Sequence, residues 1–390
     1  MIRFFCHRFK LLRSIALLAS MATLITACNP TVGGGPTINT QNAVPVALLL
    51  PYGSPNGAET SLAQSLENAA RLAIADLDGV EIDLRVYPTA ASADQAASQA
   101  AVAVNDGAKI ILGPVFGAAA NAAGVAVAPQ GINVLSFSNN TAIAGRNVFV
   151  LGNTFDNTAD QLVQFLARQG NSNVLTVYPQ TATGEIGRDA VQRALANSNV
   201  ASTGQQSYPA SQNGIIQAVR GIAENTKGTG TTAIFFTDDT SGGIPLLSQL
   251  LPENGVSTSD VQFVGLTRWD IPAGTLSLPG LQNGIFALPD PVLTGQFRER
   301  YISAYGAPPH PIAGLAYDGI AAVGALVSGG RSDALTASAL TQNAGFAGVT
   351  GVFRLRSDGR NQRGLAIARI VDRQVQIVSP APKSFGSAGF

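Results

Sequence analysis

Cysteine and histidine are scarce in this chain, and their scarcity excludes most chemistry that depends on them. Two cysteines, Cys6 and Cys28, and two histidines occur among the 390 residues. We expect an N-terminal segment carrying Cys6 to be cleaved off and Cys28 to carry lipid, so no disulfide, zinc site or thiol nucleophile is expected. His310 stands between two prolines with no activatable nucleophile beside it, which favours a loop residue over a catalytic base.

The N-terminal region has no apolar run long enough to span a membrane. Its apolar stretch, Ile15–Ile25, falls short of the roughly 20 residues that a spanning helix needs. Four basic residues precede the stretch: Arg3, Arg8, Lys10 and Arg13. The stretch ends at Thr26-Ala27-Cys28, small residues directly before a cysteine. This pattern predicts a secretory signal over residues 1–27 and a bacterial lipoprotein lipidated on Cys28, rather than a buried N-terminal helix.

Charge is sparse and, in the mature chain, slightly acidic. Charged residues make up 12% of the sequence, and removal of the signal leaves 20 Lys and Arg against 24 Asp and Glu. A net charge of −4 argues against nucleic acid as a partner, because nucleic-acid binding needs a basic face. The apolar content of 46% is typical of a globular protein, and the length suffices for two domains with full cores.

Signatures of nucleotide or metal chemistry are also missing. Gly33-Gly34-Gly35 lies in residues 28–43, a stretch of small and polar residues that predicts a flexible tether, and no Gly-x-x-x-x-Gly-Lys sequence occurs. Asp238-Asp239 could form a metal site or an acid/base pair, but a helix cap or solvated turn is favoured because no further ligands cluster nearby. We expect no metal, no cofactor and no enzymatic activity.

What the chain does contain is a repeated strand-turn-helix unit. The apolar run Ala108–Leu112 ends at Gly113-Pro114 and passes into the alanine-rich segment Ala118–Ala128. This pattern predicts a buried parallel strand, a tight turn and a helix that packs back on the sheet. Open α/β sheets bind ligands outside the carboxyl ends of their strands, so function is expected in the loops that follow the strands.

The unit recurs in two series. Further strands are predicted at Val46–Leu50, Ile82–Tyr87 and Ile132–Leu135, and then at Val148–Leu151, Val174–Tyr178, Gln205–Tyr208, Thr232–Phe236 and Val261–Val264. Helical patterns separate most of them, including one that Ser92 and Gln95 begin as a capping box. Two such series predict two doubly wound α/β lobes of mostly parallel sheet joined by a hinge.

The last third of the chain departs from this alternation. Helices are predicted at Phe297–Tyr305, Gly314–Val327 and Ala334–Gln342, followed by strands at Val352–Leu355 and Leu365–Val371. This order indicates a chain that returns to complete both lobes. We expect lobe 1 to comprise residues 44–149 and 287–363, and lobe 2 residues 150–286 and 364–380.

Several short motifs, in order over about Val44–Val378, resemble the Leu/Ile/Val-type periplasmic solute-binding proteins, which have the type I periplasmic-binding fold. The motifs are Leu48-Leu49-Leu50-Pro51, Asn105-Asp106-Gly107 before Ile111-Leu112-Gly113-Pro114, Ala128-Pro129, Ala316-Tyr317-Asp318-Gly319 and Phe346-Ala347-Gly348-Val349-Thr350-Gly351-Val352-Phe353. The resemblance implies two lobes, three crossing segments and closure on a ligand. It also implies a receptor that delivers a small polar solute to ABC permease subunits.

The positions that bind amino acids in that family are changed here. Where the family has hydroxyl residues after Gly-Pro, this chain has Phe116-Gly117-Ala118, although Ser138 keeps a hydroxyl in the next loop. Thr183 stands where the family places an aromatic residue, and Thr267 where it places the acid that binds the ligand amine. These departures argue against amino-acid binding.

A second resemblance points to a different class of function. The segment Gly265–Asp270 is similar to a Gly-Leu/Thr-x-x-Trp-Asp sequence in lipoprotein activators of penicillin-binding proteins, which act through protein contacts. Asn29, after Cys28, is not the aspartate that retains some lipoproteins in the inner membrane. Anchoring to the inner membrane and to the outer membrane both stay open.

The candidate ligand-binding residues are those at the ends of predicted strands: Tyr52, Phe116, Ser138, Asn139, Tyr178, Thr183, Thr267 and Trp269. For Trp269, contact with a ligand or partner and a role in the lobe 2 core are weighed equally. Asp318 is expected to fix local structure. Five arginines near the C-terminus are expected to form one solvated hairpin edge: Arg354, Arg356, Arg360, Arg363 and Arg369.

Overall fold

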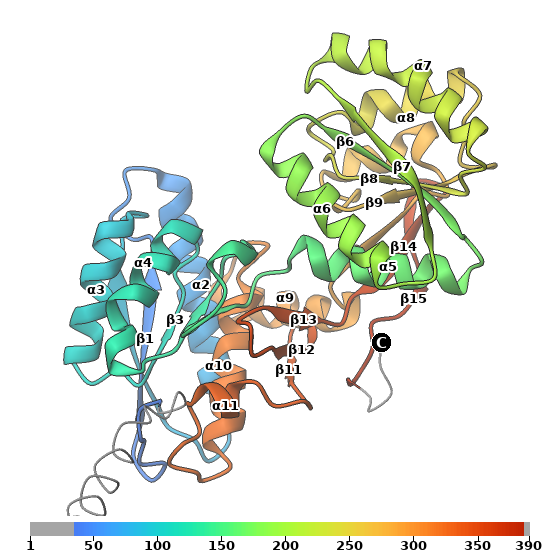
Figure 1. Ribbon diagram of the computed structural model, residues 1–390. Coiled ribbons are helices and arrows are strands. Elements are labelled where there is room, and N and C mark those ends of the chain that lie inside the picture. The colour runs from blue at the N-terminus through green and yellow to red at the C-terminus, as the bar shows by residue number, and fades with distance from the viewer. Residues whose placement is uncertain (1–34, 386–390) are drawn as a thin grey trace, which may run out of the picture. The chain divides into compact units, whose positions relative to one another are not determined.

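The computed structural model describes residues 35–385, which form two large β-sheets flanked by helices and a small third sheet (Figure 1). The first sheet has five strands in the order β2-β1-β3-β4-β5, all parallel. The second has seven, in the order β15-β14-β10-β9-β8-β6-β7, and is parallel except at β14 and β15. The prediction of two α/β lobes of mostly parallel sheet is confirmed.

Lobe 1 is the part of the chain built on the first sheet. Its elements are β1 (Val44–Leu50), α2 (Gly57–Ala75), β2 (Ile82–Pro88), α3 (Ala93–Asn105), β3 (Ile110–Leu112), α4 (Gly117–Val127), β4 (Val134–Ser136), β5 (Val148–Val150), α9 (Pro291–Tyr305), α10 (Gly314–Val327), α11 (Ala337–Leu340), and the third sheet of β11 (Phe346–Gly348), β12 (Gly351–Leu355) and β13 (Asn361–Arg363).

Lobe 2 is built on the second sheet. Its elements are α5 (Phe155–Arg168), β6 (Asn173–Pro179), α6 (Ala182–Ala196), β7 (Ala201–Tyr208), α7 (Gln212–Gly228), β8 (Ala233–Phe236), α8 (Ile244–Glu253), β9 (Gln262–Gly265), β10 (Ile285–Leu288), β14 (Ala366–Val371) and β15 (Gln374–Ser379). The chain passes between the two sheets three times, after β5, after β10 and after β13.

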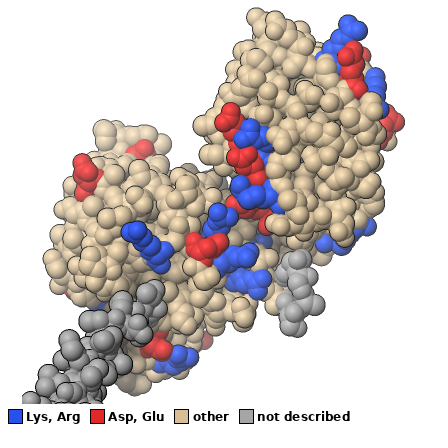
Figure 2. Space-filling model, viewed as in Figure 1, with Lys and Arg blue, Asp and Glu red and all other residues tan. Residues whose placement is uncertain are grey.

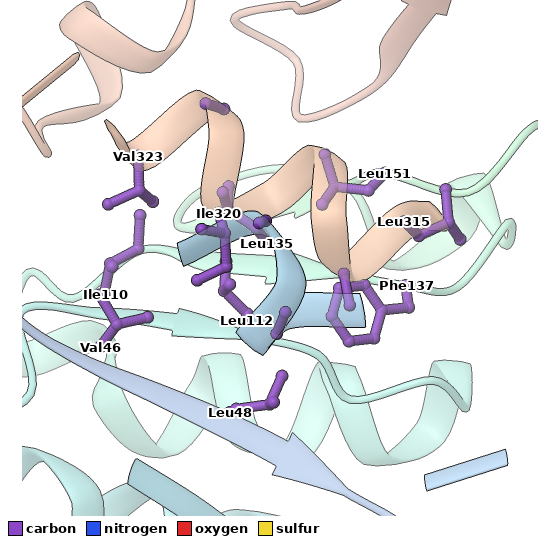
Figure 3. Packing of buried hydrophobic residues seen from close by; sticks show 14 of the residues in the cluster. Val46, Leu48, Ile110, Leu112, Leu135, Phe137, Leu151, Leu315, Ile320 and Val323 are labelled. Atoms are coloured by element: carbon purple, nitrogen blue, oxygen red, sulfur yellow. The ribbon is translucent and has the colours of Figure 1, made fainter. Parts of the chain in front are cut away.

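Both faces of the lobe 1 sheet are buried at its inner strands, which explains the apolar sequences of β1 and β3. Successive side chains of a strand point to opposite faces. Val46 and Leu48 of β1 accordingly pack in one core with α2 and α10, while Ala47 and Leu49 pack in another with α3 and α4. Figure 3 shows side chains of α10 pointing towards those of β1 and β3.

Lobe 2 has the same layered construction. Leu175 and Phe236 belong to a core on the α7 and α8 side of the sheet, and Val174 and Phe235 to a core on the α5 and α6 side. Each fully buried side chain of this size contributes about 1.5–3 kcal/mol of transfer free energy. The two cores therefore hold the strand ends, and the loops that follow them, in fixed positions.

Helix starts in both lobes are capped by the residue types that favour that position. Ser92 Oγ accepts from Gln95 N at the start of α3, as the capping pattern predicts. Thr154 Oγ1 accepts from Asn157 N at the start of α5, and Asp290 accepts from two backbone N–H groups at the start of α9. Each cap satisfies donors that the first helical turn leaves unpaired.

A buried ion pair joins α10 to the small third sheet. Arg363 Nη1 donates to Asp318 Oδ2 at 2.9 Å, and the two side chains are 4% and 0% exposed. Asp318 also accepts from Val349 N at 2.8 Å and from Thr350 Oγ1 at 2.6 Å. The carboxylate therefore reaches across to the β11–β12 turn and fixes it against α10.

The same arginine contacts the segments at which the chain crosses between the sheets. Its Nε donates to Leu151 O at 2.8 Å, directly after β5. Its Nη1 also donates to Thr350 Oγ1 at 2.7 Å, and Thr350 O accepts from Asp290 N, directly before α9, at 3.1 Å. Since Arg363 itself ends β13, one buried guanidinium connects all three crossing segments.

Two expectations need correction here. The C-terminal arginines do not form one solvated edge, because Arg363 is buried in the contacts just described. The predicted tether over residues 28–43 is wrong in its last part: Ile38 is buried in the lobe 1 core, and its N–H donates to Ser332 O at 2.9 Å. The earlier part of that segment lies outside the described residues.

Local patterns located most elements and missed others. The helix expected at Ala334–Gln342 is reduced to α11, and β10, β11, β13 and β15 were not predicted. β11, β13 and β15 are polar or short, so their apolar patterns are weak, whereas β10 is a fully apolar strand, Ile285–Leu288, that the prediction overlooked. Within residues 35–385, no helix combines the length and the apolarity that crossing a bilayer requires.

Candidate functional site

A cavity of about 760 Å³ lies in lobe 2 at the carboxyl ends of β6, β7, β8 and β9. It is lined by Phe155, Pro179, Thr181, Thr183, Gly184, Tyr208, Ala210, Ser211, Gln212, Ile215, Thr237, Asp238, Asp239, Ser241, Gly242, Gly243, Pro245, Leu246 and Thr267. The volume falls within the range of small-molecule sites. Its position is the one at which open α/β sheets bind ligands.

Two walls of the cavity are made by the same sequence pattern. Tyr178–Gly184 and Tyr208–Gly214 both have the form Tyr-Pro-x-Thr/Ser-x-x-Gly, at the β6–α6 and β7–α7 junctions. In each, the hydroxyl caps the helix by accepting from the glycine N–H, at 3.0 Å from Thr181 Oγ1 and 3.1 Å from Ser211 Oγ. Each glycine lies so close to its proline that a Cβ there would overlap the backbone. The pattern therefore sets two tight strand-to-helix turns side by side.

Asp238, which follows β8, accepts three hydrogen bonds in the wall of the cavity. Its Oδ2 accepts from Gly243 N at 2.6 Å and from the hydroxyl of Tyr208, and its Oδ1 accepts from Asp239 N at 2.8 Å. Burial, and then this hydrogen bond to Asp238, raise the pKa of Tyr208 above its usual range. Tyr208 therefore keeps its proton and acts as a donor, and Asp238 joins β7, β8 and the start of α8.

Asp239 organises the turn between β8 and α8. Its Oδ1 accepts from Ser241 N, Ser241 Oγ and Gly242 N at 2.7–2.9 Å. This is the turn role that the sequence favoured for the Asp238-Asp239 pair. Among residues 35–385, no group of three or more His, Cys, Asp or Glu side chains could hold a metal ion.

Two of the predicted site residues line this cavity. Thr183 is exposed at the start of α6, and Thr267 follows β9, where its Oγ1 donates to Asp238 O at 3.2 Å. Tyr178 does not line it, because its ring lies under the guanidinium of Arg188, 5.0 Å from the ring centroid. The cavity thus shares the Thr183 and Thr267 positions with the prediction but not the tyrosine.

Trp269 corrects the prediction, because it is a core residue. Its side chain is completely buried, with its ring centroid 6.3 Å from that of Phe236 and 6.5 Å from that of Phe286. Gly265 and Gly284 pack directly on the indole and leave no room for a Cβ. A residue so enclosed cannot contact a ligand, so the core interpretation of Trp269 is the right one.

The remaining predicted residues lie on lobe 1. Phe116 precedes α4 and is half-buried, and Ser138 is 6% exposed, its Oγ accepting from Asn140 N at 3.1 Å. Asn139, beside it, is exposed. Gly117 brings the two loops together, since a Cβ there would lie 3.1 Å from Asn140 Nδ2 and 3.6 Å from Ser138 Oγ.

Tyr52, in the loop after β1, turns towards α2. Its hydroxyl donates to Glu67 Oε2 at 2.8 Å and lies 3.2 Å from Gln64 Oε1. Burial and the bond to Glu67 raise the pKa of Tyr52 above its usual range. The hydroxyl is therefore held by lobe 1 itself, while the half-buried ring remains partly accessible.

Sequence reasoning missed Tyr208 and Phe155 and gave Asp238 a lesser role. Tyr208 ends β7, whose polar sequence carries little strand signal, yet the repeat of Tyr-Pro-x-Thr/Ser-x-x-Gly was available as a signal. Asp238 was recognised at a strand end, but its partner lies 30 residues away. Only the neighbouring positions of β6, β7 and β8 bring these residues together.

Two α/β lobes with a ligand-sized cavity at the carboxyl ends of the strands define a bilobed solute-binding fold. A protein of Rhodospirillum rubrum described as a branched-chain amino acid ABC transporter has a TM-score of 0.74 and 18% identity, over 86% of this chain and 100% of that one. An ABC transporter substrate-binding protein of Desulfitobacterium hafniense in complex with Leu has a TM-score of 0.62 and 17% identity, over 86% and 100%. At 17–18% sequence identity, the similarity of these structures shows that the chain shares their fold.

A third similar structure carries a different ligand. A solute-binding protein of an ABC transporter from Rhodopseudomonas palustris, in complex with 3,4-dihydroxybenzoic acid, has a TM-score of 0.58 and 18% identity, over 89% of this chain and 98% of that one. No curated protein matches this chain in sequence. The family model described as periplasmic binding protein matches residues 43–374, and the chain therefore belongs to the periplasmic binding protein family.

Proposed function

We propose that this chain is a non-enzymatic, lipid-anchored solute receptor that closes its two lobes around a small polar solute and delivers it to ABC-type permease subunits. The observation that carries the proposal is the cavity of about 760 Å³ at the carboxyl ends of β6–β9. Membership of the periplasmic binding protein family supports it. The transport proteins among the similar structures support delivery to a permease.

Each lobe supplies loops to the proposed site. Lobe 2 supplies the cavity with Thr183 and Thr267, and lobe 1 supplies the loops that carry Tyr52, Phe116 and Ser138-Asn139. The three crossing segments act as the hinge. The solute binds both lobes in the closed state and one lobe in the open state, so its binding shifts the open–closed equilibrium towards closure.

The N-terminal segment completes the proposal. Cleavage after Ala27 leaves Cys28 to carry the lipid, which holds the receptor at the periplasmic face of the inner or outer membrane. The residues up to 34 lie outside the described part of the chain. The small and polar residues of this stretch suit a linker between the lipid and lobe 1.

Native mass spectrometry of the protein purified from its own host tests the function. We expect a retained small molecule of a few hundred daltons, and we expect its removal and re-addition to change the radius of gyration in small-angle scattering, because the lobes open and close. The proposal would be wrong if the protein carried no solute and showed no closure. Stimulation of a penicillin-binding protein in a peptidoglycan synthesis assay would then identify it as an activator of that enzyme instead.

A further inference from the structure

The loops at the carboxyl edge of the lobe 1 sheet carry no charge. The loops are residues 51–56 after β1, 89–92 after β2, 113–116 after β3, 137–140 after β4 and 151–154 after β5. None contains Asp, Glu, Lys or Arg. On the face shown in Figure 2, charged side chains are also sparse over α3 and α4. These loops therefore offer a solute no ion-pair partner, and the charged residues of lobe 1 nearest to them in sequence are Glu59 and Asp94, in the first turns of α2 and α3.

The carboxylates of the lobe 2 cavity are engaged by lobe 2 itself. Asp238 and Asp239 are the charged residues among its described lining. Asp238 accepts two backbone N–H groups and the Tyr208 hydroxyl, and Asp239 accepts two N–H groups and the Ser241 hydroxyl. These N–H groups belong to the segment that enters α8, where the helix dipole favours negative charge. Both carboxylates thus act as built-in counter-charges to the helix start.

The other charged residues in the loops at this edge of the second sheet also have partners. Arg268 Nε donates to Asp270 Oδ1 at 2.9 Å, in the loop after β9. Asp290, after β10, accepts from Val292 N and Leu293 N at 2.9 and 3.1 Å. Two carboxylate oxygens in these loops have no described bond, Asp239 Oδ2 and Asp290 Oδ2. Asp239 is exposed, so water screens its charge, and Asp290 is half-buried at the start of α9, where the helix dipole favours a negative charge.

From this distribution of charge we infer that the solute is uncharged, with hydroxyl or carboxamide groups on one side and an apolar face on the other. The inference rests on the proposed function and names its substrate class. The hydroxyls of Thr183 and Thr267 suit the polar side, and Phe155, Ile215 and Leu246 suit the apolar face. A charged group enclosed here would lose water without gaining a partner of opposite sign, which is strongly unfavourable.

A series of probes that share one apolar tail tests the inference. The probes are 4-methylpentanamide (neutral), 4-methylpentanoate (anionic), 4-methylpentylamine (cationic) and leucine (zwitterionic), with xylitol as a neutral polyol. We expect calorimetry on the full-length protein in detergent to show the tightest binding for the amide or xylitol. Charged members should bind about tenfold to a hundredfold more weakly for each charge left without a partner.

The outcomes separate this inference from the proposed function. A charged probe that binds most tightly overturns the inference and leaves the solute receptor standing. A failure of all five probes to bind also overturns the inference, and the native mass spectrum then decides the proposed function independently. A marked fall in the best probe's affinity on raising the salt concentration would likewise contradict an uncharged solute.

A second experiment adds a negative charge to the cavity. Thr267→Asp places an unpaired carboxylate at the cavity, so the affinity for 4-methylpentylamine relative to the amide should rise about tenfold or more. Ser202→Asp is the matched control, since it adds the same charge at the exposed amino end of β7, on the opposite edge of the sheet. Equal ratios in both variants would overturn the placement of the solute at Thr267.

Discussion

Arg363→Met removes the guanidinium that connects the three crossing segments and leaves a carboxylate buried without its cation. Asp318 is completely buried and keeps two donors, Val349 N and Thr350 Oγ1. Removal of one partner of a buried ion pair costs about 3–5 kcal/mol. Arg363 Nη2 has no hydrogen-bond partner among the described residues, so the pair is incompletely satisfied to begin with. We therefore expect a loss near the lower end, about 3 kcal/mol.

Urea unfolding followed by two signals measures this loss and assigns it to a lobe. Trp269 is the one tryptophan of the chain and lies in the lobe 2 core, so its fluorescence reports on lobe 2. Circular dichroism reports on both lobes. Arg363→Met should move the circular dichroism transition to lower urea and the fluorescence transition less, because Asp318 and Thr350 belong to lobe 1.

A matched control and a second variant make the reasoning refutable. Arg360→Met changes an arginine of the same hairpin whose side chain is 45% exposed, and should cost no more than about 0.5 kcal/mol. Adding Asp318→Asn to Arg363→Met removes the orphaned charge but keeps an acceptor for Val349 N, and should restore about 1 kcal/mol or more. A loss below about 1 kcal/mol in Arg363→Met, or no recovery in the double variant, would refute the buried-pair account.

Four further predictions follow from the chain. Trp269→Ala should cost about 3–5 kcal/mol of lobe 2 stability and leave solute affinity of the folded protein unchanged, by urea unfolding and calorimetry; weakened binding at full stability would restore Trp269 to the site. Burial lowers the pKa of His310, so the stability that depends on its neutral form is present above about pH 6.5 and is lost as the pH falls through the lowered pKa. His310→Gln should remove this part of the dependence of Tm on pH, and a variant whose Tm changes with pH as the wild type's does would contradict the prediction. Cys28→Ser should abolish the lipid, and mass spectrometry that finds an unmodified wild-type N-terminus would end the lipoprotein proposal. The protein has no acid at position 267 to bind the amine of leucine and no hydroxyl residues directly after Pro114 to bind its carboxylate. Calorimetry should therefore find that leucine binds about two to four orders of magnitude more weakly than it would to a site with both contacts, and micromolar binding would contradict this.

The alternation of strands and helices could be predicted from the sequence because it depends on local patterns. The apolar run at Ile110–Leu112 and the periodic helix before Asp76 each carry their own signal over a few residues. The general location of a site, at the carboxyl ends of parallel strands, follows from the same patterns. Thr183 and Thr267, which these patterns place just after strands, line the lobe 2 cavity.

Which strand-end residues meet could not be predicted, because that depends on strand order and on burial. Tyr208 and Asp238 are 30 residues apart in sequence. They form a hydrogen bond because Tyr208 ends β7 and Asp238 follows β8, and these strands lie on either side of β6 in the sheet, so their carboxyl ends are close together. Trp269 has the sequence context of an exposed loop residue, and only the packing of Gly265 and Gly284 against its indole encloses it.

The sequence by itself determined the α/β alternation, the resemblance to a bilobed receptor and the uncharged loops of lobe 1, since each is a property of consecutive residues. Tertiary structure alone decided that Arg363 leaves the basic run to pair with Asp318, 45 residues away, and that Asp238 and Asp239 are engaged at the start of α8. The physical reason is that a charge acquires its role from the partners that the fold brings within hydrogen-bonding distance, and neighbours in sequence do not specify them.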